Sequence, residues 1–201
     1  MSAAGRIANV SGAVLIGGAS TRMGGDKASR RFAGEPAATR ASRLLASLFA
    51  DVLLVGSDPP EGAVGRVVGD GDGERCALRG VVAALAEAHA ERVLVIATDL
   101  VLLGPELLLA LVAWPAADVV LPRIDGKAEP LCALWRREPA LGLARDQLVA
   151  GRFALHALIE KLDARYIEGE ALAAFDPAGT ALANANTPED WERLEALTAD
   201  R

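Results

Sequence analysis

The sequence predicts a single α/β domain over residues 1–201, with a mostly parallel central sheet and helices on both of its faces. Short apolar runs that are continuous rather than alternating are typical of strands buried on both faces. Segments with helical periodicity lie between these runs, an alternation that predicts βαβ units. The five runs are Ala13–Ile16, Val52–Val55, Val64–Val68, Val93–Ala97 and Val119–Leu121.

The helices between these strands follow from two signals. Apolar residues at i, i+3, i+4 and i+7 predict an amphipathic helix that packs against the sheet. A proline suits the first turn of a helix, where no backbone N–H is needed. These signals predict helices at Arg40–Phe49, at Leu78–Leu85 and from Pro105 to about Trp114.

The second half of the chain is less regular. Its expected strands are Leu131–Trp135 and Arg165–Ile167, and its expected helices are Leu141–Leu148, Leu155–Leu162 and Glu189–Leu197. No internal repeat or long linker interrupts it, which favours one domain.

Composition excludes several classes of function. The net charge of −6 argues against general binding to nucleic acid or to anionic membranes. No apolar stretch reaches the ~20 residues needed to span a bilayer, and no signal peptide is recognisable. Two cysteines, Cys76 and Cys132, are too few for a disulfide framework. We therefore expect a soluble, cytoplasmic protein.

The most informative segment is LIGGASTRMGGDK, residues 15–27, directly after the first strand. Ligands of open α/β sheets bind beyond the carboxyl ends of the strands, and glycines there let backbone N–H groups approach a phosphate. Arg22 and Lys27 add cationic donors. The spacing matches neither a Walker loop nor G-x-G-x-x-G, and an ordinary βα loop with solvated cations is the alternative.

This segment resembles the L-A-G-G-x-S-x-R-M-G-x-D-K signature of the molybdenum cofactor guanylyltransferases, which are MobA-like nucleotidyltransferases. Ile16 replaces the alanine of the signature, and the paired glycines are similar to those of the guanylyl branch. The resemblance implies a Rossmann-like nucleotidyltransferase fold that binds a nucleotide. The matching residues are Leu15, Gly17, Gly18, Ser20, Arg22, Met23, Gly24, Asp26 and Lys27.

A second candidate site follows the strand Val93–Ala97. Asp99 is placed where a carboxylate can hold Mg²⁺, which keeps water and nucleotide phosphates as its other ligands. The alternative is a structural role at the end of the strand. Members of the family carry D-x-P here, which supports the metal role, and Val101 replaces the proline.

The segment VVGDGDGERCALRG resembles a family stretch that runs from an acidic residue through P-L-x-G. That acidic residue contacts the guanine nucleotide, and Asp70 is our match, with Asp72 as the competitor. A solvated turn is the alternative, because Asp-Gly pairs form turns without any ligand. Ala77 replaces the proline, and Gly56 or Ser57 occupies the region of a family asparagine.

Two further stretches match the family in the second half. DGKAEPLCALW resembles a segment that shapes the acceptor pocket, with Glu129 in place of glutamine, although an exposed hairpin at Asp125–Gly126 is the alternative. Glu129 would repel a phosphorylated acceptor unless Lys127 or Arg123 offsets its charge.

The second stretch, NANTPEDW, predicts a helix start: Thr187 as N-cap, Pro188 at the first position and Asp190 in a capping box. Asn184 and Asn186 are candidates to contact acceptor or metal. The alternative for both asparagines is a purely structural role.

Taken together, the resemblance implies transfer of GMP from GTP to molybdopterin or molybdenum cofactor, with release of pyrophosphate. The implied catalytic residues are Arg22, Lys27 and Asp99, with Asp99 holding Mg²⁺. Nucleotide binding is assigned to about 12–121 and acceptor binding to about 122–197. Cofactor-carrying proteins and molybdoenzymes are candidate partners. The implied nucleotide-binding residues are Leu15, Ile16, Gly17, Gly18, Lys27, Asp70 and Asp99.

Two alternatives remain at this point. One is a related nucleotidyltransferase that uses CTP or a sugar-phosphate acceptor. The other is a catalytically silent GTP-binding accessory protein, which the departures at Val101, Ala77 and Glu129 motivate.

Overall fold

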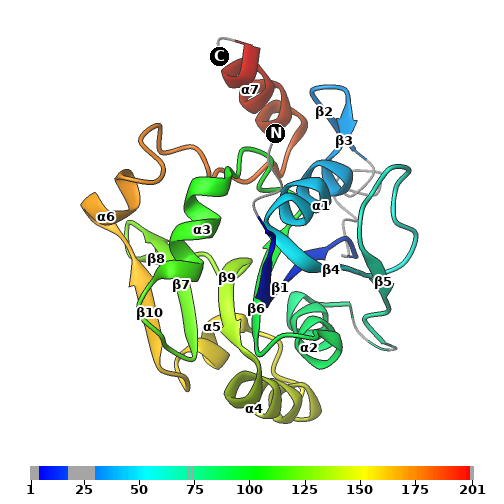
Figure 1. Cartoon of the computed structure of the whole chain (residues 1–201), viewed down its shortest axis with the longest axis vertical. Coiled ribbons are helices and arrows are strands. Elements are labelled where there is room, and N and C mark those ends of the chain that lie inside the picture. Colours follow the sequence, from blue (N-terminus) through cyan, green and yellow to red (C-terminus); the bar gives the residue numbers. More distant parts are fainter. Residues whose placement is uncertain (1–4, 18–29, 72, 74, 200–201) are drawn as a thin grey trace.

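A twisted eight-stranded sheet forms the centre of the computed structural model, which describes residues 5–17, 30–71, 73 and 75–199 (Figure 1). The strand order is β10-β7-β9-β6-β1-β4-β5, with β8 paired to β7. The strands of this sheet are β1 (Ile7–Leu15), β4 (Phe49–Val55), β5 (Arg66–Val68), β6 (Arg92–Ala97), β7 (Val119–Ile124), β8 (Lys127–Ala128), β9 (Cys132–Arg136) and β10 (Ala164–Ile167).

The sheet is mostly parallel, as predicted. β1 is an interior strand and pairs in parallel with β4 and with β6, while β4 pairs in parallel with β5 and β7 with β10. β9 is the exception, because it runs antiparallel to both β6 and β7. Its insertion leaves β7 pointing in the same direction as β6, so that both strands end at the same edge of the sheet.

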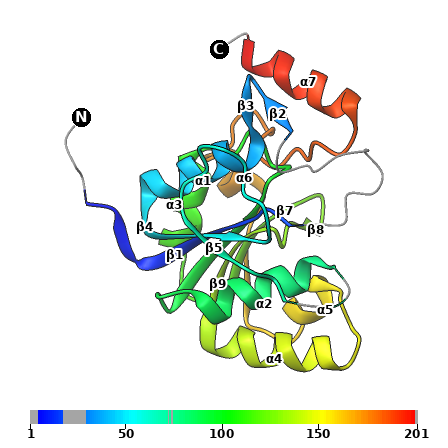
Figure 2. The ribbon, with the colours of Figure 1, turned by 90° about the vertical axis from the view of Figure 1, so that its right-hand side faces the viewer.

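Helices cover both faces of the sheet, which confirms the predicted layers (Figure 2). α1 and α3 pack on one face and α2, α4 and α5 on the other. Strand residues alternate between the two cores, as Val14 and Leu15 of β1 illustrate. The helices are α1 (Ala37–Leu48), α2 (Ala77–Glu87), α3 (Pro105–Ala113), α4 (Arg137–Val149), α5 (Leu155–Ile159), α6 (Gly169–Ala173) and α7 (Pro188–Ala199).

A third, smaller core lies beyond the main sheet. It joins the hairpin β2 (Arg31–Phe32) and β3 (Glu35–Pro36) to the loop after β6 and to α7. Phe32 and Trp191 meet edge to face in it, with ring centroids 5.9 Å apart. The closing helix is thereby attached to the loop that carries Asp99.

Several predicted boundaries differ from those of the structure, including that of the first strand, which was expected at Ala13–Ile16 and spans Ile7–Leu15; three others differ for clear local reasons. The strand expected at Val64–Val68 begins at Arg66, because Gly65 has a φ of 143° and turns the chain. Phe49 ends α1 in an extended conformation and starts β4. The helix expected at Leu155–Leu162 ends at Ile159, after which Lys161 and Leu162 donate to carbonyls three residues back.

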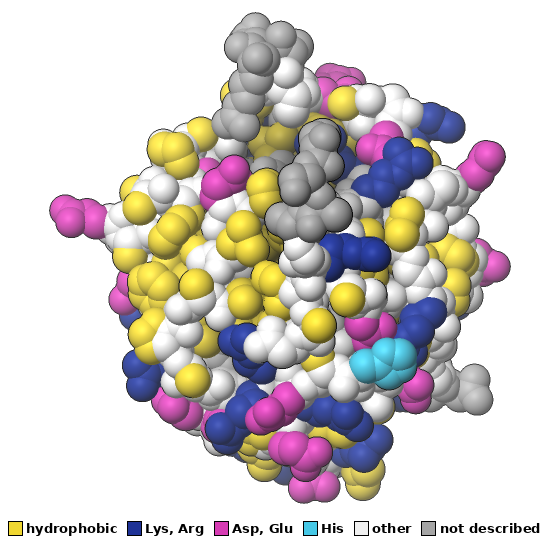
Figure 3. All heavy atoms as spheres, viewed as in Figure 1, with side chains coloured by type: hydrophobic (Ala, Val, Ile, Leu, Met, Phe, Trp, Pro, Cys, Tyr) yellow, Lys and Arg dark blue, Asp and Glu magenta, His cyan; other side chains and the backbone are white. Residues whose placement is uncertain are grey.

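Basic and acidic side chains are interspersed on the face of the molecule seen in Figure 3. The longest described helix is α4, with 13 residues. Among the described helices, none combines the length and the apolar character that a membrane span requires.

Candidate active site

Four parallel strands end at one edge of the sheet, and candidate site residues follow each of them. Gly17 lies two residues after β1, Gly56 directly after β4, Asp70 two residues after β5 and Asp99 two residues after β6. Gly17, Asp70 and Asp99 therefore lie at the same edge of the sheet. Parallel topology explains it, since strands that run together also end together.

Gly17 and Gly56 pack backbone against backbone. The N–H groups of Ile16 and Gly17 both donate to the carbonyl of Val55, at 2.9 and 3.1 Å, and Gly56 N–H donates to the carbonyl of Val68 at 2.8 Å. A Cβ atom on Gly56 would lie 2.6 Å from the backbone nitrogen of Gly17, and the φ of Gly56 is 134°. This contact excludes a side chain at position 56, so no asparagine equivalent fits there, and Ser57 is exposed.

Asp70 lies next to Gly17, which belongs to the glycine-rich segment 15–27, called the glycine loop below. A Cβ atom on Gly17 would lie 3.2 Å from Oδ2 of Asp70, so the carboxylate and the Gly17 backbone are neighbours. Asp70 is half-buried. Its competitor Asp72 lies outside the described residues, as do Gly18, Arg22 and Lys27 of the loop.

Asp99 is half-buried in the turn after β6, and its Oδ1 atom is buried. Its carbonyl oxygen accepts a hydrogen bond from the N–H of Ala185, at 2.9 Å. A carboxylate oxygen suits Mg²⁺, which is commonly held by one or two carboxylates together with substrate phosphates. Among the residues that the structure describes, no group of three or more His, Cys, Asp or Glu could hold a metal ion.

The segment DGKAEPLCALW, residues 125–135, begins with the exposed hairpin turn that the sequence offered as the alternative to an acceptor-pocket role. Asp125 and Gly126 both have positive φ, 49° and 76°, and join β7 to β8 in a two-residue turn. This geometry agrees with the preference of Asp-Gly for such turns. The hairpin lies at the same edge of the sheet as Asp99, because β7 runs parallel to β6.

Glu129 connects this hairpin to the C-terminal segment. Its Oε1 accepts from the Leu131 N–H at 3.1 Å, and its Oε2 lies 3.4 Å from the Asn184 amide nitrogen. Arg123, one of the two cations that could offset this charge, instead forms a two-pronged ion pair with Glu168, with Nη2 to Oε1 at 2.7 Å. No local pattern in the sequence indicates the Glu129–Asn184 pair, which joins residues 55 positions apart.

The predicted capping box is confirmed. Thr187 N–H donates to Oδ2 of Asp190 at 3.0 Å, and Asp190 N–H donates to Oγ1 of Thr187 at 3.1 Å. The hydrogen bond from Thr187 N–H, together with bonds from Arg193 and Asn186, holds the pKa of Asp190 below its ordinary value. The cap fixes the start of α7 and, with it, the position of Asn184 and Ala185.

Comparison with known proteins shows the family of the chain. Residues 12–167 match the model of the MobA-like NTP transferase domain. The chain belongs to this family. A MobA-like relative from Chloroflexus aggregans, which carries the name probable molybdenum cofactor guanylyltransferase, is 34% identical over 93% of this chain and 94% of its own. The molybdenum cofactor guanylyltransferase of Desulfosudis oleivorans is 31% identical over 93% and 95%.

A solved structure shares the MobA-like fold over nearly its whole length. It is the molybdopterin-guanine dinucleotide biosynthesis protein A of Archaeoglobus fulgidus, with a TM-score of 0.81 and 24% identity. The superposition covers 95% of this chain and 100% of that one. The predicted fold is thus confirmed, and the chain is a nucleotidyltransferase by family.

Proposed function

We propose that this protein transfers GMP from GTP to the terminal phosphate of molybdopterin or of its molybdenum-bearing form. The observation that carries this proposal is the convergence of Gly17, Asp70 and Asp99 at one edge of the sheet, in a chain of the MobA-like family. The relatives named above supply the substrate assignment. Residues of about 12–121 would bind the nucleotide and residues of about 122–197 the acceptor.

The reaction needs positioning more than covalent help from the protein. An oxygen of the acceptor phosphate forms a bond to the α-phosphorus of GTP, and the bond from that phosphorus to the oxygen bridging to the β-phosphate breaks. Pyrophosphate leaves with the bonding electrons. Held in line, these groups react without an enzyme-bound intermediate.

Each candidate residue has a distinct role in this scheme. The Leu15–Gly18 backbone and Asp70 bind the nucleotide. Gly56 lacks a side chain, which lets the Gly17 backbone pass close beside it. Arg22 and Lys27 neutralise charge on the α-phosphate and the leaving group. Asp99 holds Mg²⁺, which neutralises phosphate charge when it is bound. Asn184 and Asn186 contact the acceptor.

The cellular setting follows from the thiols and the substrates. Cys76 and Cys132 are free, Cys132 is fully buried, and this burial raises the pKa of its thiol far above its ordinary value. Free thiols suit a reducing compartment. We place the protein in the cytoplasm, with cofactor-carrying proteins or molybdoenzymes as partners.

The test is pyrophosphate release with GTP, CTP, ATP or UTP, each with molybdopterin and Mg²⁺. Guanylyl transfer predicts turnover with GTP and a loss of about 10²–10³ in kcat for Lys27→Ala or Asp99→Asn. Asp146→Asn, an exposed carboxylate on α4, is the matched control and should keep wild-type activity. A preference for CTP would assign the chain to the cytidylyl branch. Binding of GTP without turnover would make it a silent accessory protein.

A further inference from the structure

The loop that carries Asp99 is built on a tight turn. Leu103 N–H donates to the carbonyl of Leu100 at 3.3 Å, which makes Val101 the second residue of a four-residue turn. Proline is favoured at this position because its fixed φ suits the turn. The family motif has proline here, whereas this chain has valine and forms the same kind of turn without it.

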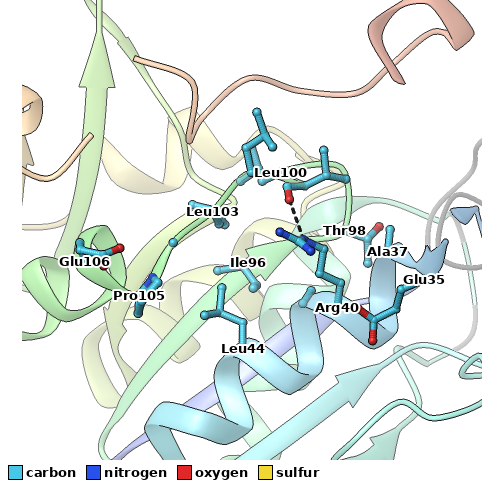
Figure 4. A pocket seen from close by; sticks show the side chains of 14 residues that line it. Glu35, Ala37, Arg40, Leu44, Ile96, Thr98, Leu100, Leu103, Pro105 and Glu106 are labelled. Atoms are coloured by element: carbon cyan, nitrogen blue, oxygen red, sulfur yellow. Dashed lines mark hydrogen bonds between the residues drawn. The ribbon is translucent and has the colours of Figure 1, made fainter. Parts of the chain in front are cut away.

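Arg40 reaches this turn from α1. Its Nε donates a hydrogen bond to the carbonyl of Val101 at 3.0 Å, a contact between residues 61 positions apart (Figure 4). The guanidinium carbon also lies 5.6 Å from the centroid of the Phe32 ring. Phe32 and Val101 share the third core and are both buried. Arg40 therefore packs against the third core, to which Val101 of the turn also belongs.

A cavity of about 480 Å³ separates α1 from the segment 98–106. Figure 4 shows Arg40 extending toward the turn, with Ile96 and Leu44 beside it. The cavity lining includes Thr98, which directly precedes Asp99, and Leu100 and Leu103, which close the turn. On this side the turn therefore faces open volume, and packing there restrains it less than a filled core would.

We propose that Arg40 is a positioning residue for Asp99. By binding the Val101 carbonyl, the Arg40 guanidinium restrains the turn in place of the proline that the family has at this position. At the start of the loop, the Ala185 N–H holds the Asp99 carbonyl. The metal role of Asp99 rests on the proposed function, but the ordering of the turn does not.

The direct test is hydrogen exchange at the Leu103 amide, which reports opening of the turn without any substrate. Arg40→Met and Arg40→Lys should both speed this exchange by about threefold to tenfold, because lysine keeps the charge but has no N–H at the Nε position. Arg43→Met is the control, since Arg43 lies one turn further along α1 in an exposed ion pair with Glu35. It should leave the amide unchanged.

The decisive comparison repeats Arg40→Met in a Val101→Pro background. If both residues order the same turn, proline should reduce the effect of losing Arg40 to less than half of its value in the wild-type background, on a logarithmic scale. Equal effects in both backgrounds, or equal exchange in the Arg40 and Arg43 variants, would overturn the proposal.

A second readout links the turn to the metal. The Mg²⁺ concentration for half-maximal turnover should rise about threefold to tenfold in Arg40→Met, with the KM for GTP at saturating Mg²⁺ little changed, and Val101→Pro should restore it. A Tm loss with an unchanged Mg²⁺ requirement would mean that Arg40 is merely structural. Absence of turnover in the wild type would refute the proposed function and leave the exchange result standing.

Discussion

Gly56 and Gly17 touch backbone to backbone, with 2.6 Å between the Gly17 nitrogen and the place of a Cβ atom on Gly56. Two adjacent strand ends therefore approach more closely than any side chain at position 56 allows. The contact sets the direction in which the chain leaves β1 toward the glycine loop. In the sequence, Gly56 is notable only because it occupies the region of a family asparagine. The structure shows why glycine stands there: the Gly17 backbone leaves no room for a Cβ atom.

Gly56→Ala should destabilise the fold by about 2 kcal/mol or more, because it adds a backbone clash to the strain of a positive φ. Gly126→Ala is the control: Gly126 also has a positive φ, 76°, but a Cβ atom there meets nothing within 4 Å. It should cost about 1–2 kcal/mol from strain alone. Thermal or urea unfolding of both variants measures the difference, and equal losses would contradict the proposed clash.

A partly buried hydrogen-bonded pair, Ser11 and Asp51, lies away from the strand ends that carry the candidate site and predicts a pH dependence. Ser11 Oγ donates to Oδ2 of Asp51 at 2.6 Å and accepts from Ala90 N–H at 3.1 Å. Burial alone would raise the pKa of Asp51, but hydrogen bonds from Ser11, His89 N–H and Arg66 outweigh it and place the pKa below the ordinary 3.8. The carboxylate therefore stabilises the fold above that value, and this stability is lost as the pH falls through the lowered pKa.

Ser11→Ala should cost about 2–3 kcal/mol near neutral pH, because it removes a bond to a charged group and strands a buried N–H. The difference from wild type should narrow as the pH falls below the ordinary pKa of 3.8 and through the lowered pKa of Asp51 in the wild type, because the Ser11 bond stabilises the ionised carboxylate that protonation removes. Unfolding free energies measured across this range provide the check. Ser47→Ala, an exposed serine of α1, should change little at any pH. A constant difference down to pH 2–3 would assign the whole effect to packing.

The cap of α7 predicts a smaller effect. Thr187→Ala should destabilise the fold by about 1 kcal/mol through the loss of the Thr187 Oγ1–Asp190 N–H bond. Thr198→Ala at the other end of α7 removes only a bond to the Glu195 carbonyl and should cost less. Denaturant midpoints of the two variants decide the matter, and the opposite ranking would show that the capping box does not stabilise the helix.

The fold could be predicted because its signals are local. The runs Val52–Val55 and Val93–Ala97 fall within β4 and β6, since a strand buried on both faces must be apolar along its length. The direction of a strand cannot be predicted in this way. β9 is as apolar as its neighbours, and nothing in its sequence indicates that it runs antiparallel to them. The two-residue strands of the β2–β3 hairpin are too short for any periodicity to show.

In the candidate site, too, some features could be predicted from local sequence signals and others could not. Asp70 and Asp99 could be placed at one edge because the ends of parallel strands share it. The contact between Arg40 and Val101 spans 61 positions and that between Asn184 and Glu129 spans 55, and neither leaves a local pattern. Such contacts depend on how helices and loops pack on the sheet, which residue spacing does not encode.

Glu129 predicts a measurable cost in acceptor binding. Its carboxylate stands where the family has glutamine, and the neighbouring Arg123 is already paired with Glu168. Glu129→Gln preserves the geometry, because the amide oxygen can accept from Leu131 N–H while the Asn184 amide turns to accept from the new NH₂ group. The variant therefore isolates the charge.

At low ionic strength Glu129→Gln should lower the KM for the phosphorylated acceptor by about threefold, with kcat within about twofold, because a like charge is removed from its surroundings. The gain should shrink at high salt, where exposed charges are screened. Glu170→Gln, an exposed acid in the first turn of α6, removes the same charge elsewhere and should leave the KM unaltered. Steady-state kinetics at two ionic strengths separate the variants. An unchanged KM in Glu129→Gln would mean that the acceptor phosphate binds away from the β8–β9 segment.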